Sequence, residues 1–396
     1  MSVISAGEVD YDPYDMAIYR DPYEVYRRLR DEHPLYYNER YDFYAVSRFD
    51  DVERVLVDRA TFLSCRGSVL ELIQSGVEIP PGTVIFEDPP IHTIHRSLLS
   101  RVFTPRKMLA LEPQVRGFCR ERLDRLVGAE RFDVTEELGS QVPMKVIGML
   151  LGIPEQDQEA IRDHVDAGLG REDGTPSDYS QGFASSEVYA DYIDWRYEHP
   201  SDDLMTTLIT VEFDDEHGER RRLSRDEVLS YVMILSGAGN ETTNRLIGWT
   251  AKLLSDNPDA RREIAADRSL VNGAIEEVLR YEAPPYVIGR YVGADVEIHG
   301  HVVPAGSAIV TIPGAANRDE RKFDDPDRFD IHRSIGHHFS FGYGPHFCLG
   351  AALARLEGRV VLDEMLERFP DWEVDESGAE LGGHLRGWNA LPVIVR

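Results

Sequence analysis

The most regular pattern of apolar and polar positions lies between residues 224 and 257. Ser224-Arg-Asp-Glu227 is a capping box, in which a hydroxyl and a carboxylate bind free amides at the start of a helix. Residues of one continuous face then repeat at spacings of three and four: Val228, Tyr231, Val232, Leu235, Ala238, Thr242 and Leu246. Asn257-Pro258 ends the pattern. About 30 residues at 1.5 Å each span roughly 45 Å, so we predict a helix that crosses the core of a whole domain.

Helical patterns dominate much of the remaining chain, with β-rich stretches at two places. One strand-like run covers residues 41–49, and a second β-rich stretch covers residues 292–312 around a His299-Gly300 turn. The chain shows no repeat and no linker long enough to separate two domains. We therefore predict one mainly α-helical domain with small β-sheets, residues 1–396. Its β-containing part is expected at about residues 1–60 and 285–335, and its helical body at about residues 60–285 and 348–370.

The middle of the predicted long helix contains costly residues. Gly237 and Gly239 each cost up to about 1 kcal/mol relative to alanine inside a helix, and Glu241 adds a charge. One interpretation is a close helix crossing with Glu241 facing solvent. The other is a groove for a flat ligand, at which the Thr242 hydroxyl bonds to the carbonyl of Ala238 and loosens the helix. These residues alone leave both interpretations open.

Composition narrows the class of protein. Hydrophobic residues make up 42% of the 396 residues, which is enough for a sizeable core. Lys and Arg number 43 against 71 Asp and Glu, and the formal charge of −28 disfavours nucleic-acid and anionic-membrane partners. No stretch reaches the roughly 18 apolar residues of a membrane span. Three scattered cysteines indicate a reducing compartment. We expect a soluble, cytoplasmic monomer with neither a signal peptide nor a membrane anchor.

Cys348 lies in the most informative segment, Phe339-Ser-Phe-Gly-Tyr-Gly-Pro-His-Phe-Cys-Leu-Gly350. An amphipathic run follows, so Cys348 is expected at the start of a helix, where the dipole and free amides favour a thiolate. The glycines would let the backbone fold around the sulfur. Cys65 and Cys119 are expected to be small buried hydrophobes. A single thiolate without companion ligands cannot close a zinc or iron–sulfur site, but it can be the one axial ligand of a haem.

Here the sequence resembles the cytochrome P450 family. The haem-binding signature of that family matches, spacing included, at Phe341, Gly342, Gly344, His346, Cys348 and Gly350. Further segments follow in the family's order. Residues 238–242 resemble its oxygen-activation motif, residues 277–280 its Glu-x-x-Arg pair, and residues 326–329 the segment that supplies a further arginine to that pair. The matches run from about residue 20 to the end. The resemblance implies the cytochrome P450 fold, with the long helix crossing over the haem.

The resemblance also implies roles for single residues. Haem b would be held by Cys348 as the iron ligand, with Phe341, Gly342, Gly350, Ala238 and Gly239 around it. Buried propionates require cationic or hydrogen-bonding partners. The implied partners are His92, Arg96, Arg290 and His346.

Two further groups follow from the same resemblance. Glu277 and Arg280, joined by Arg328, would form a structural network that supports the cysteine loop. Thr242 and Glu241 would manage protons, Thr242 by holding the oxygen molecule and a water, and Glu241 by general acid–base transfer from solvent.

The implied reaction is monooxygenation of a lipophilic small molecule with O2. The chain carries no flavin or nicotinamide fingerprint, so NAD(P)H-derived electrons would come through a separate ferredoxin and ferredoxin reductase. Docking of the ferredoxin needs a local basic face, for which the candidates are Arg101, Arg106, Lys107, Arg355 and Arg359. Substrate contacts are expected from the apolar loop 66–87 and from Val287, Ile288, Leu235, Trp388 and Asn389. Residues 168–186 are either a lid or a connector.

Three alternatives are weaker. A peroxide-driven peroxygenase would not need the proton relay that Glu241 and Thr242 imply. A haem-thiolate protein that only binds ligands would need neither the relay nor an apolar access loop. A zinc hydrolase using the pairs His92/His95, His299/His301 or His337/His338 lacks the usual His-Glu-x-x-His pattern.

Overall fold

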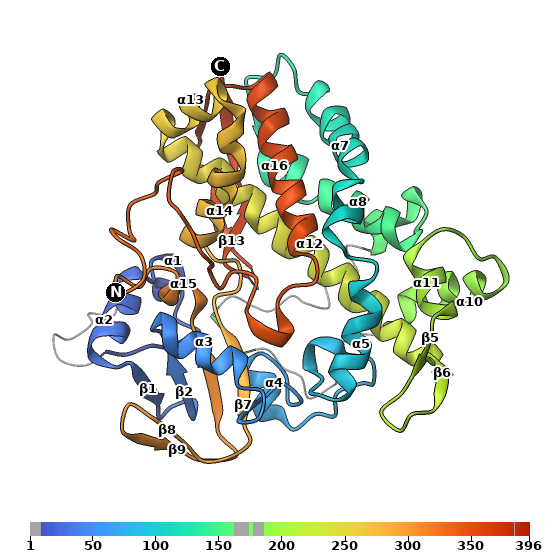
Figure 1. Ribbon diagram of the computed structural model, residues 1–396. Coiled ribbons are helices and arrows are strands. Elements are labelled where there is room, and N and C mark those ends of the chain that lie inside the picture. The colour runs from blue at the N-terminus through green and yellow to red at the C-terminus, as the bar shows by residue number, and fades with distance from the viewer. Residues whose placement is uncertain (1–8, 162–173, 177–185, 384) are drawn as a thin grey trace.

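Helices form about half of the computed structural model, which describes residues 9–161, 174–176, 186–383 and 385–396 (Figure 1). The α-helices are α1 (Met16–Arg20), α2 (Tyr23–Glu32), α3 (Phe49–Val57), α4 (Leu70–Ser75), α5 (Ile91–Ser100), α6 (Pro105–Leu109), α7 (Glu112–Asp124), α8 (Val142–Leu151), α10 (Ala190–Glu198), α11 (Leu204–Thr210), α12 (Arg225–Asp256), α13 (Pro258–Ala266), α14 (Val271–Tyr281), α15 (Pro313–Ala316) and α16 (Ala351–Arg368). Short helical turns are η1 (Val84–Phe86), η2 (Thr135–Gly139), η3 (Ser186–Tyr189), η4 (Arg268–Leu270) and η5 (Gly344–His346). The predicted mainly helical fold class is confirmed.

The long helix α12 runs diagonally through the middle of the molecule (Figure 1). Its capping box is present: Ser224 Oγ accepts from the amide of Glu227, and the Glu227 carboxylate accepts from the amide of Ser224. The helix spans 32 residues and ends before Asn257, as the sequence predicted. It packs against α8, α14 and α16, so it carries the centre of the largest hydrophobic cluster.

Gly239 lies at a close crossing of two helices, which is one of the two interpretations that the sequence left open for this part of the helix. A Cβ atom at Gly239 would lie 3.3 Å from Cδ1 of Ile147 on α8, so this glycine permits a close helix crossing. Ala238, the preceding residue, is exposed although Ser236 and Asn240 are buried. The helix therefore has one face closed by α8 and an accessible position immediately beside it.

The strands form one larger sheet and several small ones. Strand order in the five-stranded sheet is β1-β2-β10-β7-β3, antiparallel except for the parallel pair β2 and β10. The strands are β1 (Leu35–Asn38), β2 (Phe43–Val46), β3 (Phe62–Leu63), β4 (Arg131–Asp133), β5 (Glu212–Asp214), β6 (Arg220–Arg222), β7 (Ile288–Val292), β8 (Val296–Ile298), β9 (His301–Val303), β10 (Ala308–Thr311), β11 (Trp372–Val374), β12 (Glu380–Gly382), β13 (Gly387–Ala390) and β14 (Pro392–Val395). The predicted turn at His299 and Gly300 joins β8 to β9, with φ of 50° and 78°.

Some strands lie where the sequence predicted only helices. The charged run 212–222 forms the hairpin β5–β6, and β4 joins β14 and β11 in a three-stranded sheet. Among the described residues, no helix is both long and apolar enough to cross a membrane. Most of the expected lid or connector, residues 168–186, lies outside the described residues.

Candidate cofactor and substrate site

The cysteine loop is a compact turn immediately before α16. The amide of Cys348 donates to the carbonyl of Phe341 at 2.8 Å, which closes the loop on itself. Gly342 and Gly344 have φ of 64° and 69°, a backbone conformation that favours glycine. A Cβ atom at Gly344 would lie 2.8 Å from the carbonyl oxygen of Leu56, so the loop presses directly on the end of α3. The glycines expected to shape this loop therefore have a structural reason at both positions.

The charge state expected for Cys348 needs a correction. Burial raises the pKa of the Cys348 thiol, although the amides of Gly350 and Ala351 and the Arg96 and Arg355 guanidinium groups act in the opposite direction. The helix start therefore does not by itself make a thiolate, contrary to the sequence-based expectation. A metal ion deprotonates a coordinating thiol outright, so a bound cation would reverse this balance. Of the other cysteines, Cys119 is buried as expected, whereas Cys65 is exposed.

Four nitrogen-bearing side chains converge beside this loop from three parts of the fold. His92 and Arg96 come from α5, Arg290 from β7 and His346 from η5. The rings of His92 and His346 lie 4.1 Å apart between centroids, and the Arg96 guanidinium donates to the carbonyl of Phe347. Burial, together with the neighbouring His92, Arg290 and Arg96, lowers the pKa of His346 to about 3. The four side chains that the resemblance assigned to propionates thus lie in one place.

In the part of the chain that the structure describes, carboxylates reach this cluster only at longer range, where Asp88 acts on Arg290 and Glu87 and Asp88 act on His92. Burial lowers the pKa of Arg290 to about 10, and within the described residues no carboxylate lies within ion-pair distance of its guanidinium, which donates to the carbonyl of Gly289. His92 Nε2 is buried without a hydrogen-bond partner. Leaving a cation and a ring nitrogen in that state is costly unless an acceptor completes the site. A dianionic group such as the propionates of haem therefore fits the residues present.

The middle of α12 supplies a hydroxyl and a carboxylate. Thr242 Oγ1 donates to the carbonyl oxygen of Ala238 at 2.7 Å, which confirms the predicted bond. Glu241 does not face open solvent: its side chain is 15% exposed and contacts Arg245 and the amide of Leu385. The sequence analysis missed Arg245 as a partner of Glu241, although their spacing of four residues on a helix was a usable signal.

The predicted pair Glu277 and Arg280 forms a fully buried ion pair at 2.7 Å, with 0% exposure of either side chain. Arg328 is not its third member, and this expectation is wrong. Arg328 is 62% exposed and contacts Asp325 and Asp330. Arg333 takes the place instead, with Nε 3.2 Å from Glu277 Oε1. The segment 326–329 contributes backbone: the carbonyl of Pro326 accepts from Arg280, and that of Arg328 accepts from Arg333.

The predicted substrate residues divide into two groups. Val287 lines an apolar pocket, and Ile288 lies near the cysteine loop, with its Cδ1 3.9 Å from where a Cβ at Gly342 would be. Leu235 packs against the main core cluster. Trp388 and Asn389 serve α12 instead: the Trp388 ring packs edge-on against Trp249, and Asn389 Oδ1 accepts from Arg245. Direct substrate contact by these last two stays a prediction.

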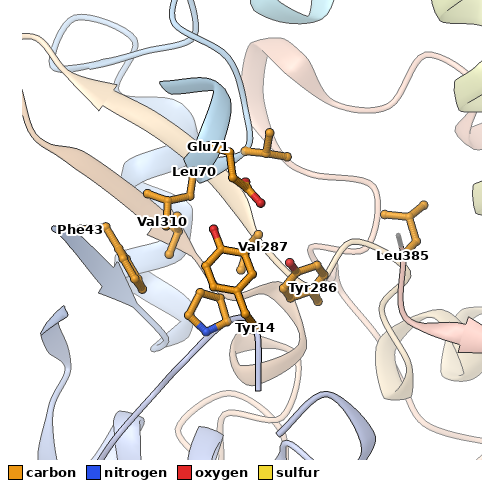
Figure 2. A pocket seen from close by; sticks show the side chains of 10 residues that line it. Tyr14, Phe43, Leu70, Glu71, Tyr286, Val287, Val310 and Leu385 are labelled. Atoms are coloured by element: carbon orange, nitrogen blue, oxygen red, sulfur yellow. The ribbon is translucent and has the colours of Figure 1, made fainter. Parts of the chain in front are cut away.

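The apolar pocket combines segments that are far apart in sequence (Figure 2). Sequence reasoning missed most of its lining, because only the folded chain brings the N-terminal segment, β2, β10 and the C-terminal hairpin together. The lining residues are Pro13, Tyr14, Phe43, Val69, Leu70, Glu71, Tyr286, Val287, Val310 and Leu385.

The five candidate docking residues fall into two groups, one paired with carboxylates and one exposed. Arg355 and Arg359 are engaged by Glu276 and Glu112, at 2.5 and 2.7 Å. Arg101, Arg106 and Lys107 are exposed at the end of α5 and on α6, a helix that packs against α16. Only these three basic side chains keep the free charge expected of a docking face.

Within the described ranges, no three His, Cys, Asp or Glu side chains converge as ligands for a metal ion.

The family model described as Cytochrome P450 matches residues 181–381. The chain is 38% identical to the "Putative cytochrome P450 123" of Mycobacterium tuberculosis, over 98% of each protein. The solved structure of cytochrome P450 CYP109Q5 from Chondromyces apiculatus matches with a TM-score of 0.87 and 34% identity over 98% of both chains. A mutant of P450 EryK in complex with erythromycin B matches with a TM-score of 0.84 and 32% identity over 96% of both chains.

Proposed function

The chain belongs to the cytochrome P450 family as a haem-thiolate monooxygenase, and from this premise we propose that it oxidises a lipophilic small molecule with electrons from a separate ferredoxin and ferredoxin reductase. The site assignment rests on the cluster beside the cysteine loop, which consists of His92, Arg96, Arg290 and His346. Arg290 is buried without a carboxylate partner among the described residues, and His92 Nε2 is buried without a hydrogen-bond partner. Both are groups that an anionic cofactor edge would complete.

The residues of this chain would have separate roles around the cofactor. Haem bound through a cysteine thiolate supplies an iron whose electron density favours cleavage of the O–O bond. Cys348 would hold the iron, and His92, Arg96, Arg290 and His346 would bind the propionates. The hydroxyl hydrogen of Thr242 is given to the carbonyl of Ala238, so its oxygen keeps lone pairs that can accept from a water. Glu241, one residue earlier, would pass protons to that water.

A lipophilic substrate is supported by the character of the pocket. Phe43, Leu70, Val287, Val310 and Leu385 contribute apolar side chains to it. The cavity measures about 40 Å³, so it can take only part of a ligand, which it would bind mainly by burying apolar surface. The erythromycin B complex of EryK is a macrolide complex, and macrolides therefore belong in the set of candidate substrates.

An external electron supply is supported by the exposed basic trio Arg101, Arg106 and Lys107. An acidic ferredoxin would be attracted to these charges even though the whole chain carries a net charge of −28. Reversal of two charges, Arg106→Glu with Lys107→Glu, should weaken ferredoxin binding at low salt by about tenfold. The exposed Arg262→Glu on α13 is the matched control. Equal affinities in both variants would remove the trio from the docking face.

The reaction is tested by one experiment with three arms. The purified holoprotein is titrated with erythromycin B, testosterone and palmitic acid, and the spin state of the ferric haem is followed by absorption. Each compound is then incubated with NADPH, ferredoxin and ferredoxin reductase, or with hydrogen peroxide alone. Product that requires the redox proteins supports the proposal. Product with peroxide alone indicates a peroxygenase, and a spin-state change without product in either arm indicates a binding protein.

A further inference from the structure

Glu241 is held by two donors from different parts of the chain. Its Oε1 lies 3.4 Å from Nη2 of Arg245, one helical turn later on α12. The same oxygen accepts from the amide of Leu385, at 3.3 Å. Leu385 lies 144 residues further along, between β12 and β13. The carboxylate is therefore fixed between a helix and a hairpin.

Arg245 is built into that hairpin. Its side chain is 7% exposed, and Nη1 donates to the carbonyl of Trp388 at 2.7 Å and to Asn389 Oδ1 at 3.2 Å. A Cβ atom at Gly383 or at Gly387 would collide with the Arg245 side chain. The two glycines thus leave the space that the arginine occupies. Among the described residues, Glu241 is the one carboxylate within ion-pair distance of this guanidinium.

Leu385 contacts both Glu241 and the apolar pocket. Its side chain lines the pocket together with Tyr286 and Val287 (Figure 2), while its amide donates to Glu241. The hydroxyl of Tyr19 donates to the carbonyl of Leu385 at 3.1 Å and to that of Gly383 at 3.3 Å. The carbonyl of Leu385 is therefore held by Tyr19, while its amide is directed at the carboxylate.

We propose that Arg245 and the Leu385 amide are positioning groups for Glu241, which they hold against α12, one residue before Thr242. This inference rests on the proposed role of Glu241 in moving protons. A carboxylate that swings away from α12 would deliver protons to Thr242 less often, because proton transfer needs donor and acceptor within hydrogen-bond reach. Arg245 acts only through Glu241, so its removal should imitate loss of the relay and should leave haem binding intact.

The test uses the holoprotein without added substrate, supplied with NADPH and the redox proteins. Dioxygen can leave as peroxide, with one NADPH oxidised and one proton taken up, or as two waters, with two NADPH oxidised and two protons taken up. Loss of proton delivery raises the peroxide released per NADPH toward one. We expect Arg245→Met to lower the share of oxygen converted to water by about tenfold. Arg245→Lys keeps a cation and should restore most of it. Lys252→Met removes the cation of another i,i+4 pair on α12 and should resemble the wild type.

Hydrogen exchange gives a second readout that is independent of turnover. In Glu241→Ala the Leu385 amide loses its acceptor and should exchange about tenfold faster, and in Arg245→Met it should follow. If the Leu385 amide exchanges at the wild-type rate in both variants, it is not fixed by Glu241 and Arg245, and the proposal is overturned. If Glu241→Gln releases as much peroxide per NADPH as the wild type, Glu241 does not deliver protons. That result would overturn both the proposed relay and this inference. If Glu241→Gln is impaired and Arg245→Met is not, the inference alone is overturned.

Discussion

Arg333 Nε lies 3.2 Å from Oε1 of Glu277, a carboxylate with no exposed side-chain surface. Glu277 thus pairs with two arginines, and Arg333 also donates to the backbone carbonyls of Asp324 and Asp325. Removing Arg333 takes one of two cationic partners from the buried Glu277 carboxylate, so Arg333→Ala should lower the free energy of unfolding by about 2 kcal/mol. Arg328→Ala, at an exposed site, should change it by less than about 0.5 kcal/mol. Urea unfolding followed by circular dichroism measures both, and equal effects would contradict the assignment.

Replacement of Cys348 tests the metal ligand. Cys348→Ser should abolish the red-shifted absorption band that the ferrous protein gives with carbon monoxide, because serine offers no thiolate. Cys65→Ser, at an exposed site, is the matched control and should keep the band. If Cys348→Ser keeps the band as well, another residue holds the iron.

Thr242 should govern how efficiently electrons reach product. Thr242→Ala removes the hydroxyl that bonds to Ala238, so haem should stay bound while most reducing equivalents appear as peroxide, with a loss of product of about tenfold or more. Thr242→Ser retains a hydroxyl at the same atom and should recover most of the product. Peroxide and product are measured per NADPH consumed. Unchanged coupling in Thr242→Ala would exclude this hydroxyl from the proton route.

Replacement of Arg290 should preserve or raise the stability of the apoprotein but should weaken haem binding in the holoprotein. Its guanidinium is buried without a carboxylate partner among the described residues, so Arg290→Met should leave the apoprotein as stable as the wild type or more stable. In the holoprotein the same change removes a propionate partner, and hemin should transfer to apomyoglobin about tenfold faster or more. Arg262→Met, at an exposed site, controls for the change of net charge. An unchanged transfer rate would remove Arg290 from the propionate partners.

Glu276 should contribute stability that depends on pH. Burial opposes its ionisation, but hydrogen bonds from Arg355 and the nearby His338 ring, 3.4 Å away, outweigh burial and lower its pKa to about 2, against about 4.5 when unfolded. Between these values the unfolded chain binds more protons, so stability falls as the pH falls. The difference in unfolding free energy between wild type and Glu276→Gln should be full above pH 5 and should shrink steadily toward pH 3. A difference independent of pH would contradict the shift.

Local patterns predicted much of the fold and of the site. The capping box at Ser224, the end of α12 at Asn257 and the glycines of the cysteine loop are encoded within a few neighbouring residues. The bond from Thr242 to Ala238 also follows from helical spacing. Each of these predictions rests on geometry that a short segment fixes by itself.

Contacts across the fold were not predictable in the same way. Arg328 and Arg333 lie five residues apart in one segment, and only the folded loop determines which of them reaches Glu277. Gly239 faces Ile147, about 90 residues earlier in the sequence, a contact that no local pattern states, whereas the expected contact of Gly239 with the cofactor stays a prediction. The contacts of Arg245 with residues 383–389 depend on how the C-terminal hairpin docks, which no local pattern states.

The docking of that hairpin has a consequence for the order in which the molecule folds. Tyr19 binds the carbonyls of Gly383 and Leu385, and Arg386 donates to the carbonyls of Tyr19 and Arg20. The bonds of Tyr19 to Gly383 and Leu385 join residues 364 and 366 positions apart, so a very large loop of chain must close before they form. Because contacts at such separation form slowly, α1 should reach the hairpin after contacts between near neighbours are in place.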